Sequence, residues 1–206
     1  MHKTRIESFL YKKLCPISLL LQNVRPNAIT ATGLIFAIIA GVFFALSSNF
    51  IALLLLGSIF TFISGCMDIV DGEVARLSKM ESKAGDFLDH VSDRVADVVL
   101  IIGLSVCAYG DVHLGTIAIV GVLLLSYMGA LPQCYGISRI YIGLLSRMNR
   151  MLLLVTIPVV QFFTIKSFSL YGIFNVSWID LMFIGFIFGS AITIIQRILT
   201  TTQVLQ

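Results

Sequence analysis

Apolar residues run along most of this chain in stretches of about twenty, the length that a helix needs to cross a bilayer. Short polar segments separate these stretches. The pattern predicts six membrane-spanning helices, at residues 29–46, 50–67, 91–109, 112–131, 151–165 and 179–199. We therefore expect an all-α integral membrane protein whose fifth span is kinked at Pro158.

Residues 1–28, before the first predicted span, have apolar and charged positions at helical spacing. The apolar face would carry Ile6, Phe9, Leu10, Leu14, Ile17 and Leu21, and the charged face Lys3, Arg5, Lys12 and Lys13. This pattern predicts an N-terminal amphipathic helix that lies in the membrane interface. The alternative is a soluble helix that packs on the rest of the chain. We expect no signal peptide. We also expect residues 1–206 to form one domain, with the interfacial helix in residues 1–28 and a six-helix membrane domain in residues 29–199.

The composition excludes the soluble, disordered and disulfide-rich classes of protein. Charged residues make up 12% of the chain, whereas soluble domains contain about 25%. The net charge of +3 is too small to indicate binding to nucleic acid, so no such partner is expected. The four cysteines are scattered without a CxxC pair, which indicates small apolar residues rather than metal ligands.

The basic residues are distributed unevenly between the two sides of the predicted membrane domain. Thirteen of the fourteen Lys and Arg residues fall on the side that holds both termini and the second and fourth loops, and Lys166 falls on the other side. Loops rich in Lys and Arg remain in the cytoplasm. We therefore expect a multi-pass protein of the cell membrane with cytoplasmic N- and C-termini.

Eight of the eleven acidic residues lie between residues 67 and 97, at the junction of the second and third predicted spans. They are Asp68, Asp71, Glu73, Glu81, Asp86, Asp89, Asp93 and Asp97. Asp68 and Asp71 are three residues apart, and Asp89 and Asp93 are four apart, so each pair shares a helix face. Two such helices packed side by side would bring four carboxylates together.

Four carboxylates in one cavity need cations between them. Oxygen ligands favour Mg²⁺ or Mn²⁺ over zinc, and four carboxylates suit two bridged ions that clamp a reacting phosphate. The alternative is a transporter in which intramembrane aspartates form a proton or cation pathway.

The residues between the carboxylates match the pattern D-x2-D-G-x2-A-R-x8-G-x3-D-x3-D from Asp68 to Asp93. This pattern resembles the signature of the CDP-alcohol phosphatidyltransferase family (class I). The segment from Pro26 to Thr30 resembles the P-N-x-x-T motif that precedes the first span in this family. The predicted arrangement of six spans after an interfacial helix is also similar to the architecture of the family. The resemblance covers nearly the whole chain but is loose after Leu131.

The resemblance implies an enzyme that transfers the phosphatidyl or archaetidyl group of a CDP-linked lipid to a small alcohol and releases CMP. The lipid would be CDP-diacylglycerol or CDP-archaeol. Asp68, Asp71, Asp89 and Asp93 would bind two Mg²⁺ or Mn²⁺ ions, and Asp93 would also act as general base. Family members are typically homodimers, so a homodimer is expected.

The resemblance also implies a set of residues that bind the CDP-lipid. They are Asn27, Thr30, Gly72, Ala75, Arg76, Ser82 and Gly85. Gly85 could instead serve helix packing, Arg76 could reach lipid headgroups, and Asn27 or Thr30 could cap a helix. Asp97 lies outside the signature, and we interpret it as a structural partner, for example of Arg94.

Four arginines on the cytoplasmic side are candidates for binding an acceptor phosphate: Arg139, Arg147, Arg150 and Arg197. Arginine binds phosphate oxygens with two hydrogen bonds at once. We therefore favour a phosphorylated polyol as acceptor. A similarity of residues 143–150 to archaeal-type members slightly favours glycerol phosphate over inositol phosphate. The alternatives are serine or an amino alcohol as acceptor, with the arginines acting only as topology determinants; Arg147 could equally point towards lipid headgroups.

Overall fold

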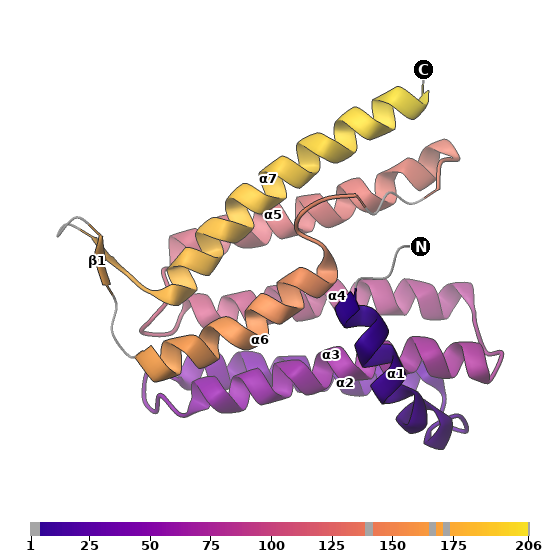
Figure 1. Ribbon diagram of the computed structural model, residues 1–206, viewed down its shortest axis with the longest axis horizontal. Coiled ribbons are helices and arrows are strands. Elements are labelled where there is room, and N and C mark those ends of the chain that lie inside the picture. The colour runs from indigo at the N-terminus through magenta and orange to yellow at the C-terminus, as the bar shows by residue number, and fades with distance from the viewer. Residues whose placement is uncertain (1–4, 139–141, 165–167, 171–173, 206) are drawn as a thin grey trace.

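The computed structural model describes residues 5–138, 142–164, 168–170 and 174–205 (Figure 1). Within this part of the chain, helices dominate. The α-helices are α1 (Arg5–Leu20), α2 (Pro26–Leu46), α3 (Leu53–Leu77), α4 (Lys83–Ser105), α5 (Val112–Ala130), α6 (Arg147–Thr164) and α7 (Trp178–Leu205). A 3₁₀ helix, η1 (Leu131–Tyr135), follows α5, and a short antiparallel hairpin of β1 (Phe168–Leu170) and β2 (Phe174–Val176) precedes α7.

Four helical segments are long and apolar enough to cross a membrane: α2, α3, α5 with η1, and α7. The helical, multi-pass character predicted from the sequence is thus confirmed. Each of the six predicted spans overlaps one of the helices α2 to α7. However, α4 carries the four aspartates Asp86, Asp89, Asp93 and Asp97, and α6 begins with two arginines in its first turn. Six spans therefore stay a prediction, as does an interfacial position for α1.

The helices α3 and α4 extend beyond the predicted spans towards each other. The predicted second span stops at residue 67, but α3 continues to Leu77, and α4 begins at Lys83 instead of residue 91. The apolar pattern ends at the first charges, whereas the backbone hydrogen bonds continue because Ala, Glu and Arg are good helix formers. Both pairs of aspartates consequently lie within rigid helices.

The helix α4 begins at a well-defined cap. The Ser82 side chain accepts a hydrogen bond from the backbone N–H of Gly85 at 3.0 Å, which satisfies one of the free N–H groups of the first turn. Only residues 78–82 connect α3 to α4, so the two helices run antiparallel from this connection. This short loop keeps the end of α3 close to the start of α4.

The helices α2, α3 and α4 pack together, and α5 and α7 lie side by side and slant away from them (Figure 1). α6 packs against both α3 and α7. The main buried cluster includes Phe44, Leu54, Leu104, Phe183 and Phe186, and so joins the two groups of helices. The core therefore leaves the start of α6 next to the acidic ends of α3 and α4.

Glycines allow α2 and α4 to approach closely. A Cβ atom added at Gly103 would lie 2.9 Å from the carbonyl carbon of Gly41, a separation that real Cβ atoms do not adopt. Small residues at such crossings let helix backbones touch in membranes. This contact fixes the position of α4, which carries Asp89 and Asp93, against α2.

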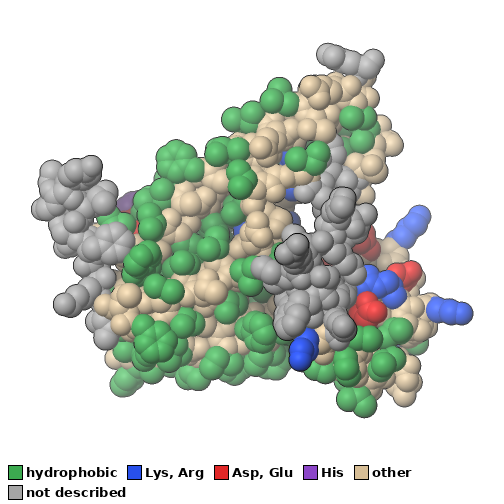
Figure 2. Space-filling view, in the orientation of Figure 1, with side chains coloured by type: hydrophobic (Ala, Val, Ile, Leu, Met, Phe, Trp, Pro, Cys, Tyr) green, Lys and Arg blue, Asp and Glu red, His purple; other side chains and the backbone are tan. Residues whose placement is uncertain are grey.

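The charged side chains gather at one end of the molecule (Figure 2). At the other end, Asp180 in the first turn of α7 makes hydrogen bonds to the backbone, one of them to the start of α5. The Asp180 carboxylate accepts hydrogen bonds from the backbone N–H of Asp111 at 2.8 Å and of Ser177 at 3.2 Å. The four cysteines, Cys15, Cys66, Cys107 and Cys134, are free thiols.

Candidate active site

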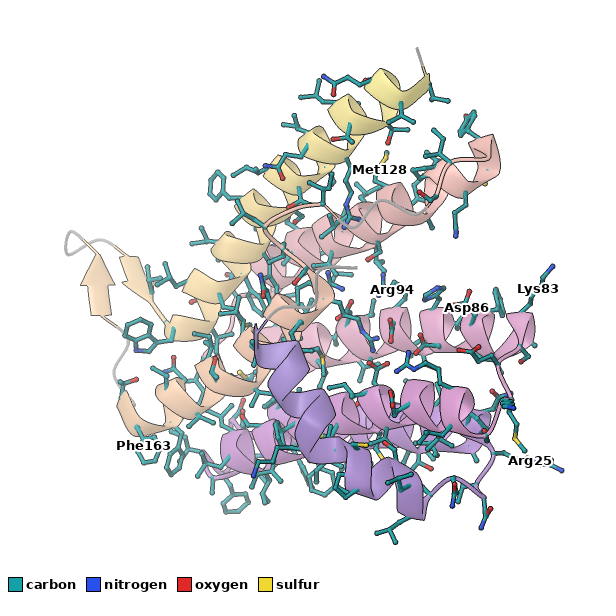
Figure 3. All side chains as sticks on the ribbon, turned by 45° about the vertical axis from the view of Figure 1, so that its right-hand side comes forward. Arg25, Lys83, Asp86, Arg94, Met128 and Phe163 are labelled. Carbon is teal, nitrogen blue, oxygen red and sulfur yellow. The ribbon has the colours of Figure 1, made fainter. Side chains whose placement is uncertain are left out.

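The helices α3 and α4 bring the predicted aspartates together. Carboxylate oxygens of Asp68, Asp71 and Asp89 lie within 4.8 Å of one another. Asp93 lies one turn beyond Asp89, and ligand atoms of Asp89, His90 and Asp93 also fall within 4.8 Å of one another. Figure 3 shows Lys83, Asp86 and Arg94 in order along α4, so the acidic stretch occupies the first half of this helix.

The carboxylates are withdrawn from the surface to different degrees. Asp71 is 5% exposed and Asp93 is 6% exposed, whereas Asp68 and Asp89 are half-buried. The Thr30 hydroxyl of α2 donates a hydrogen bond to Asp71 Oδ2 at 2.5 Å. Asp89 Oδ1 is buried and has no hydrogen-bond partner among the described residues.

This donor set fits a divalent metal ion. A buried carboxylate oxygen without a partner is costly, and it needs a cation or a donor to compensate for lost hydration. The cluster of Asp68, Asp71 and Asp89 contains oxygen ligands only, which are the ligands that Mg²⁺ and Mn²⁺ prefer.

Arg147, the first residue of α6, reaches into the acidic cluster. Its Nη2 donates a hydrogen bond to Asp68 Oδ1 at 2.5 Å and forms an ion pair with Asp93. Thr30, Ser64, Asp68, Asp71, Asp93, Asp97 and Arg147 line a common pocket. The Arg147 side chain therefore points at the carboxylates and not towards lipid headgroups.

The residues predicted to bind the CDP-lipid lie around the ends of α2, α3 and α4. A Cβ atom added at Gly85 would lie 3.2 Å from both Asn27 Oδ1 and Ser82 Oγ, so these three residues meet at the start of α4. A Cβ atom at Gly72 would meet no described atom within 4 Å, which leaves the backbone there open. Ala75 is half-buried, and the exposed Arg76 pairs with Glu73 at 2.7 Å.

The predicted acceptor arginines do not all reach the pocket. Arg139 lies outside the described residues. Arg150 is 3% exposed, and its Nη2 pairs with Asp97 at 2.8 Å. Arg197 donates to the backbone carbonyls of Leu125 at 2.7 Å and Ile142 at 3.0 Å. Of the predicted arginines that the structure describes, Arg147 lines the pocket, whereas Arg150 and Arg197 hold backbone near it.

Sequence reasoning missed the contacts that join the site across helices, among them those of Arg147 with Asp68 and Asp93. The hydrogen bond from Thr30 to Asp71 joins residues 41 positions apart, and the pair of Arg150 with Asp97 joins residues 53 positions apart. Asp97 was expected to pair with Arg94, whose Nε lies 3.9 Å away, but Arg150 is closer. The available signal was the position of Asp97, one turn beyond Asp93 inside an apolar helix, where a buried acid needs a basic partner.

Comparison with known proteins identifies relatives over most of the chain. The chain is 24% identical over 157 residues to the archaetidylinositol phosphate synthase of Pyrococcus horikoshii, covering 76% of this chain and 79% of the relative. It is 27% identical over 204 residues to the phosphatidylinositol phosphate synthase of Streptomyces avermitilis, covering 95% of this chain and 80% of the relative.

The fold matches that of a solved enzyme. The crystal structure of Mycobacterium tuberculosis phosphatidylinositol phosphate synthase with CDP-DAG bound superimposes with a TM-score of 0.73 at 22% identity, covering 90% of this chain and 92% of that one.

The family model for CDP-alcohol phosphatidyltransferases matches residues 23–201, which include the acidic cluster and all the helices from α3 to α6. The signature in α3 and α4, the match over most of the chain and the shared fold agree. The chain belongs to the CDP-alcohol phosphatidyltransferase family and is a transferase of phospholipid biosynthesis.

Proposed function

We propose that this enzyme transfers the phosphatidyl or archaetidyl group of a CDP-linked lipid to a hydroxyl of a phosphorylated polyol and releases CMP. The observation that carries the proposal is the convergence of Asp68, Asp71 and Asp89 beside the Arg147 guanidinium. Such a site attracts metal-bound phosphates on its acidic side and a free phosphate on its basic side.

Asp68, Asp71, Asp89 and Asp93 would hold two divalent cations, Mg²⁺ or Mn²⁺. Cations held there would supply positive charge to the pyrophosphate and so stabilise CMP as a leaving group. The partnerless Asp89 Oδ1 supports this role because it lacks a donor among the described residues. A crystal structure of the Mycobacterium tuberculosis synthase is a complex with manganese and citrate, so a protein of the same fold binds Mn²⁺.

The CDP-lipid would lie along the open side of α3, next to the start of α4. Gly72 leaves the backbone of α3 accessible, and Asn27 and Ser82 offer polar side chains next to Gly85 at the start of α4. Thr30 would act through Asp71, to which it donates its hydroxyl hydrogen. Ala75 would leave room for the nucleotide, and Arg76 would bind a phosphate after leaving Glu73.

Asp93 would act as the general base. The acceptor hydroxyl oxygen attacks the phosphorus next to the lipid, its proton passes to Asp93, and the bond from that phosphorus to the CMP oxygen breaks. No covalent enzyme intermediate is needed. Arg147 pairs with Asp93, so an acceptor phosphate bound to Arg147 would bring the attacking hydroxyl close to the base.

The names of the relatives favour inositol phosphate as the acceptor, because those described above are an archaetidylinositol phosphate synthase and two phosphatidylinositol phosphate synthases. Glycerol phosphate, which residues 143–150 slightly favour, is the second candidate. Arg139, Arg150 and Arg197 remain predicted contributors to acceptor binding, Arg147 being the nearest to the pocket. Six spans, cytoplasmic termini, a cell-membrane location and a homodimer also stay predictions.

An acceptor panel tests the proposal. Purified protein would be incubated with CDP-diacylglycerol or CDP-archaeol and Mg²⁺ or Mn²⁺, and CMP release would be followed with inositol phosphate, glycerol phosphate, inositol and serine. We expect CMP only with a phosphorylated polyol, fastest with inositol phosphate. Turnover with serine or free inositol alone would overturn the acceptor assignment, and absence of CMP with every acceptor would overturn the proposed reaction.

A further inference from the structure

Asp97 is a buried carboxylate that the family signature does not contain. It is 3% exposed and lies on α4, one turn beyond Asp93. Its Oδ2 accepts a hydrogen bond from Arg150 Nη2 at 2.8 Å, across to α6, and Arg150 is equally buried. Asp93 and Asp97 therefore pair with Arg147 and Arg150 respectively, so two acids of α4 face two arginines of α6.

Arg150 also fastens the segment that leads into α6. Its Nη1 donates to the Leu145 carbonyl at 3.3 Å, and the Leu145 N–H donates to Thr193 of α7 at 3.4 Å. Asn149 donates to the Leu144 carbonyl at 2.8 Å. The position of residues 142–146, and hence of Arg147, depends on where Arg150 is held.

A buried ion pair is a weak source of stability, because the two charges lose their hydration. Apolar residues of the same volume would hold α4 against α6 about as well. The gain from such a pair is one defined register between the helices. Here that register keeps the Arg147 guanidinium next to Asp68 and Asp93.

We propose that Asp97 is a positioning residue for the acceptor: through Arg150 it aligns the start of α6 with α4, so that Arg147 lies beside the base Asp93. This inference deepens the proposed function and rests on its acceptor site. Arg94 also links the two acids, because its Nη2 lies 3.3 Å from Asp93 and its Nε lies 3.9 Å from Asp97. Without the Asp97 charge, Arg94 and Arg150 both lose an acidic partner.

The test compares Asp97→Asn with the wild type in steady-state kinetics, varying the acceptor at saturating CDP-lipid and then the reverse. We expect the acceptor KM to rise about tenfold or more, in line with the loss of a charge-assisted hydrogen bond, while the CDP-lipid KM stays unchanged. Asp180→Asn is the matched control. Asp180 also accepts hydrogen bonds from across the fold, but at the opposite end, and its variant should change neither KM.

A double-mutant cycle shows whether Asp97 acts through Arg150. Arg150→Gln alone should raise the acceptor KM as Asp97→Asn does, and the double variant should be little worse than either single variant, because contacting residues are not additive. Fully additive effects would overturn the proposal. So would an Asp97→Asn variant in which both KM values rise equally, or in which only the unfolding temperature falls.

Two outcomes separate this inference from the proposed function. If the wild type uses an unphosphorylated acceptor, the proposed acceptor is wrong and the positioning role for a phosphate falls with it. If the wild type uses a phosphorylated polyol and Asp97→Asn leaves its KM unchanged, only the inference is wrong. Should Asp97→Asn fail to fold, Asp97→Glu decides: a raised acceptor KM with unchanged CDP-lipid KM supports the inference, and wild-type values overturn it.

Discussion

Arg147 supplies the positive charge that the acidic cluster would otherwise obtain from metal ions. Its guanidinium lies between Asp68 and Asp93, two of the predicted metal ligands. A cation that binds these carboxylates must compete with Arg147 for the same oxygens. In the proposed mechanism, cations held by these aspartates would take over part of the pairing of Arg147, which would leave its guanidinium available to an acceptor phosphate.

We therefore expect Arg147→Ala to have two opposite effects. The acceptor KM should rise about tenfold or more, as expected when a charge-assisted hydrogen bond is lost. The Mg²⁺ concentration for half-maximal activity should fall, because a competing charge has been removed. Both are measured from CMP release. Arg25→Ala, which removes an exposed arginine at the start of α2, is the control and should change neither value. A higher Mg²⁺ requirement in Arg147→Ala would contradict the competition.

Asp93→Asn tests the base. The change keeps the side-chain volume but removes the proton acceptor, so kcat should fall about 10²- to 10⁴-fold, the usual contribution of a general base. CDP-lipid binding, measured by calorimetry in detergent with Mg²⁺, should be largely kept, because Asp68, Asp71 and Asp89 remain. Near-normal turnover would remove Asp93 from the mechanism.

At the scale of single residues, the sequence predicted the aspartates of the site but not the residues that form hydrogen bonds or ion pairs with them. Asp68, Asp71, Asp89 and Asp93 were predictable because each pair lies within one helix, where spacing determines the face. The partners come from other helices: Thr30 from α2 and Arg147 from α6. No local pattern encodes these contacts, since they depend on how the helices pack.

At the scale of elements, the positions of the helices were predictable and their ends were not. The apolar stretches gave the location of each helix from α2 to α7, but α3 extends ten residues past the predicted end because the helix continues through the acidic motif. The segment between α5 and α6 was predicted only as a basic stretch. Its path depends on contacts with α7, such as Gly143 against Thr193, which the sequence does not reveal.

The crossing of α2 and α4 is the element contact that the site depends on most directly. Gly103→Ala would add a Cβ atom against the backbone of Gly41 and force the helices apart, at a cost of about 1–3 kcal/mol, as for other overpacked sites. We expect a lower unfolding temperature in detergent and reduced turnover.

Gly185→Ala on α7 is the matched control for this prediction. A Cβ atom there would meet no described atom within 4 Å, so the unfolding temperature and turnover should match the wild type. If Gly103→Ala and Gly185→Ala behave alike, the close approach of α2 and α4 does not limit the packing.

At the scale of the whole molecule, charge is concentrated at one end (Figure 2). The site lies at that end, where α3 meets α4. In the proposed reaction, the water-soluble acceptor would enter and CMP would leave at this end, whereas the lipid chains of the donor would stay in the bilayer. The distribution of Lys and Arg predicts that this end faces the cytoplasm.

Reporter fusions in bacterial cells test this orientation. A green fluorescent protein fused to either terminus should fluoresce, and alkaline phosphatase fused to either terminus should be inactive. Alkaline phosphatase inserted next to Lys166 should be active, because that loop is predicted to lie outside. Active phosphatase at one terminus only would require an odd number of spans and would contradict the predicted topology.

The close contact between Gly41 and Gly103 is a point about which α4 can tilt. Ten residues, a length of about 15 Å, separate Gly103 from Asp93, so a tilt of α4 by about 4° about this contact displaces Asp93 by about 1 Å. A displacement of that size can cost about a hundredfold in rate. Bilayers that are thinner or thicker than the helices change helix tilt. Turnover should consequently depend on the acyl-chain length of the surrounding lipids.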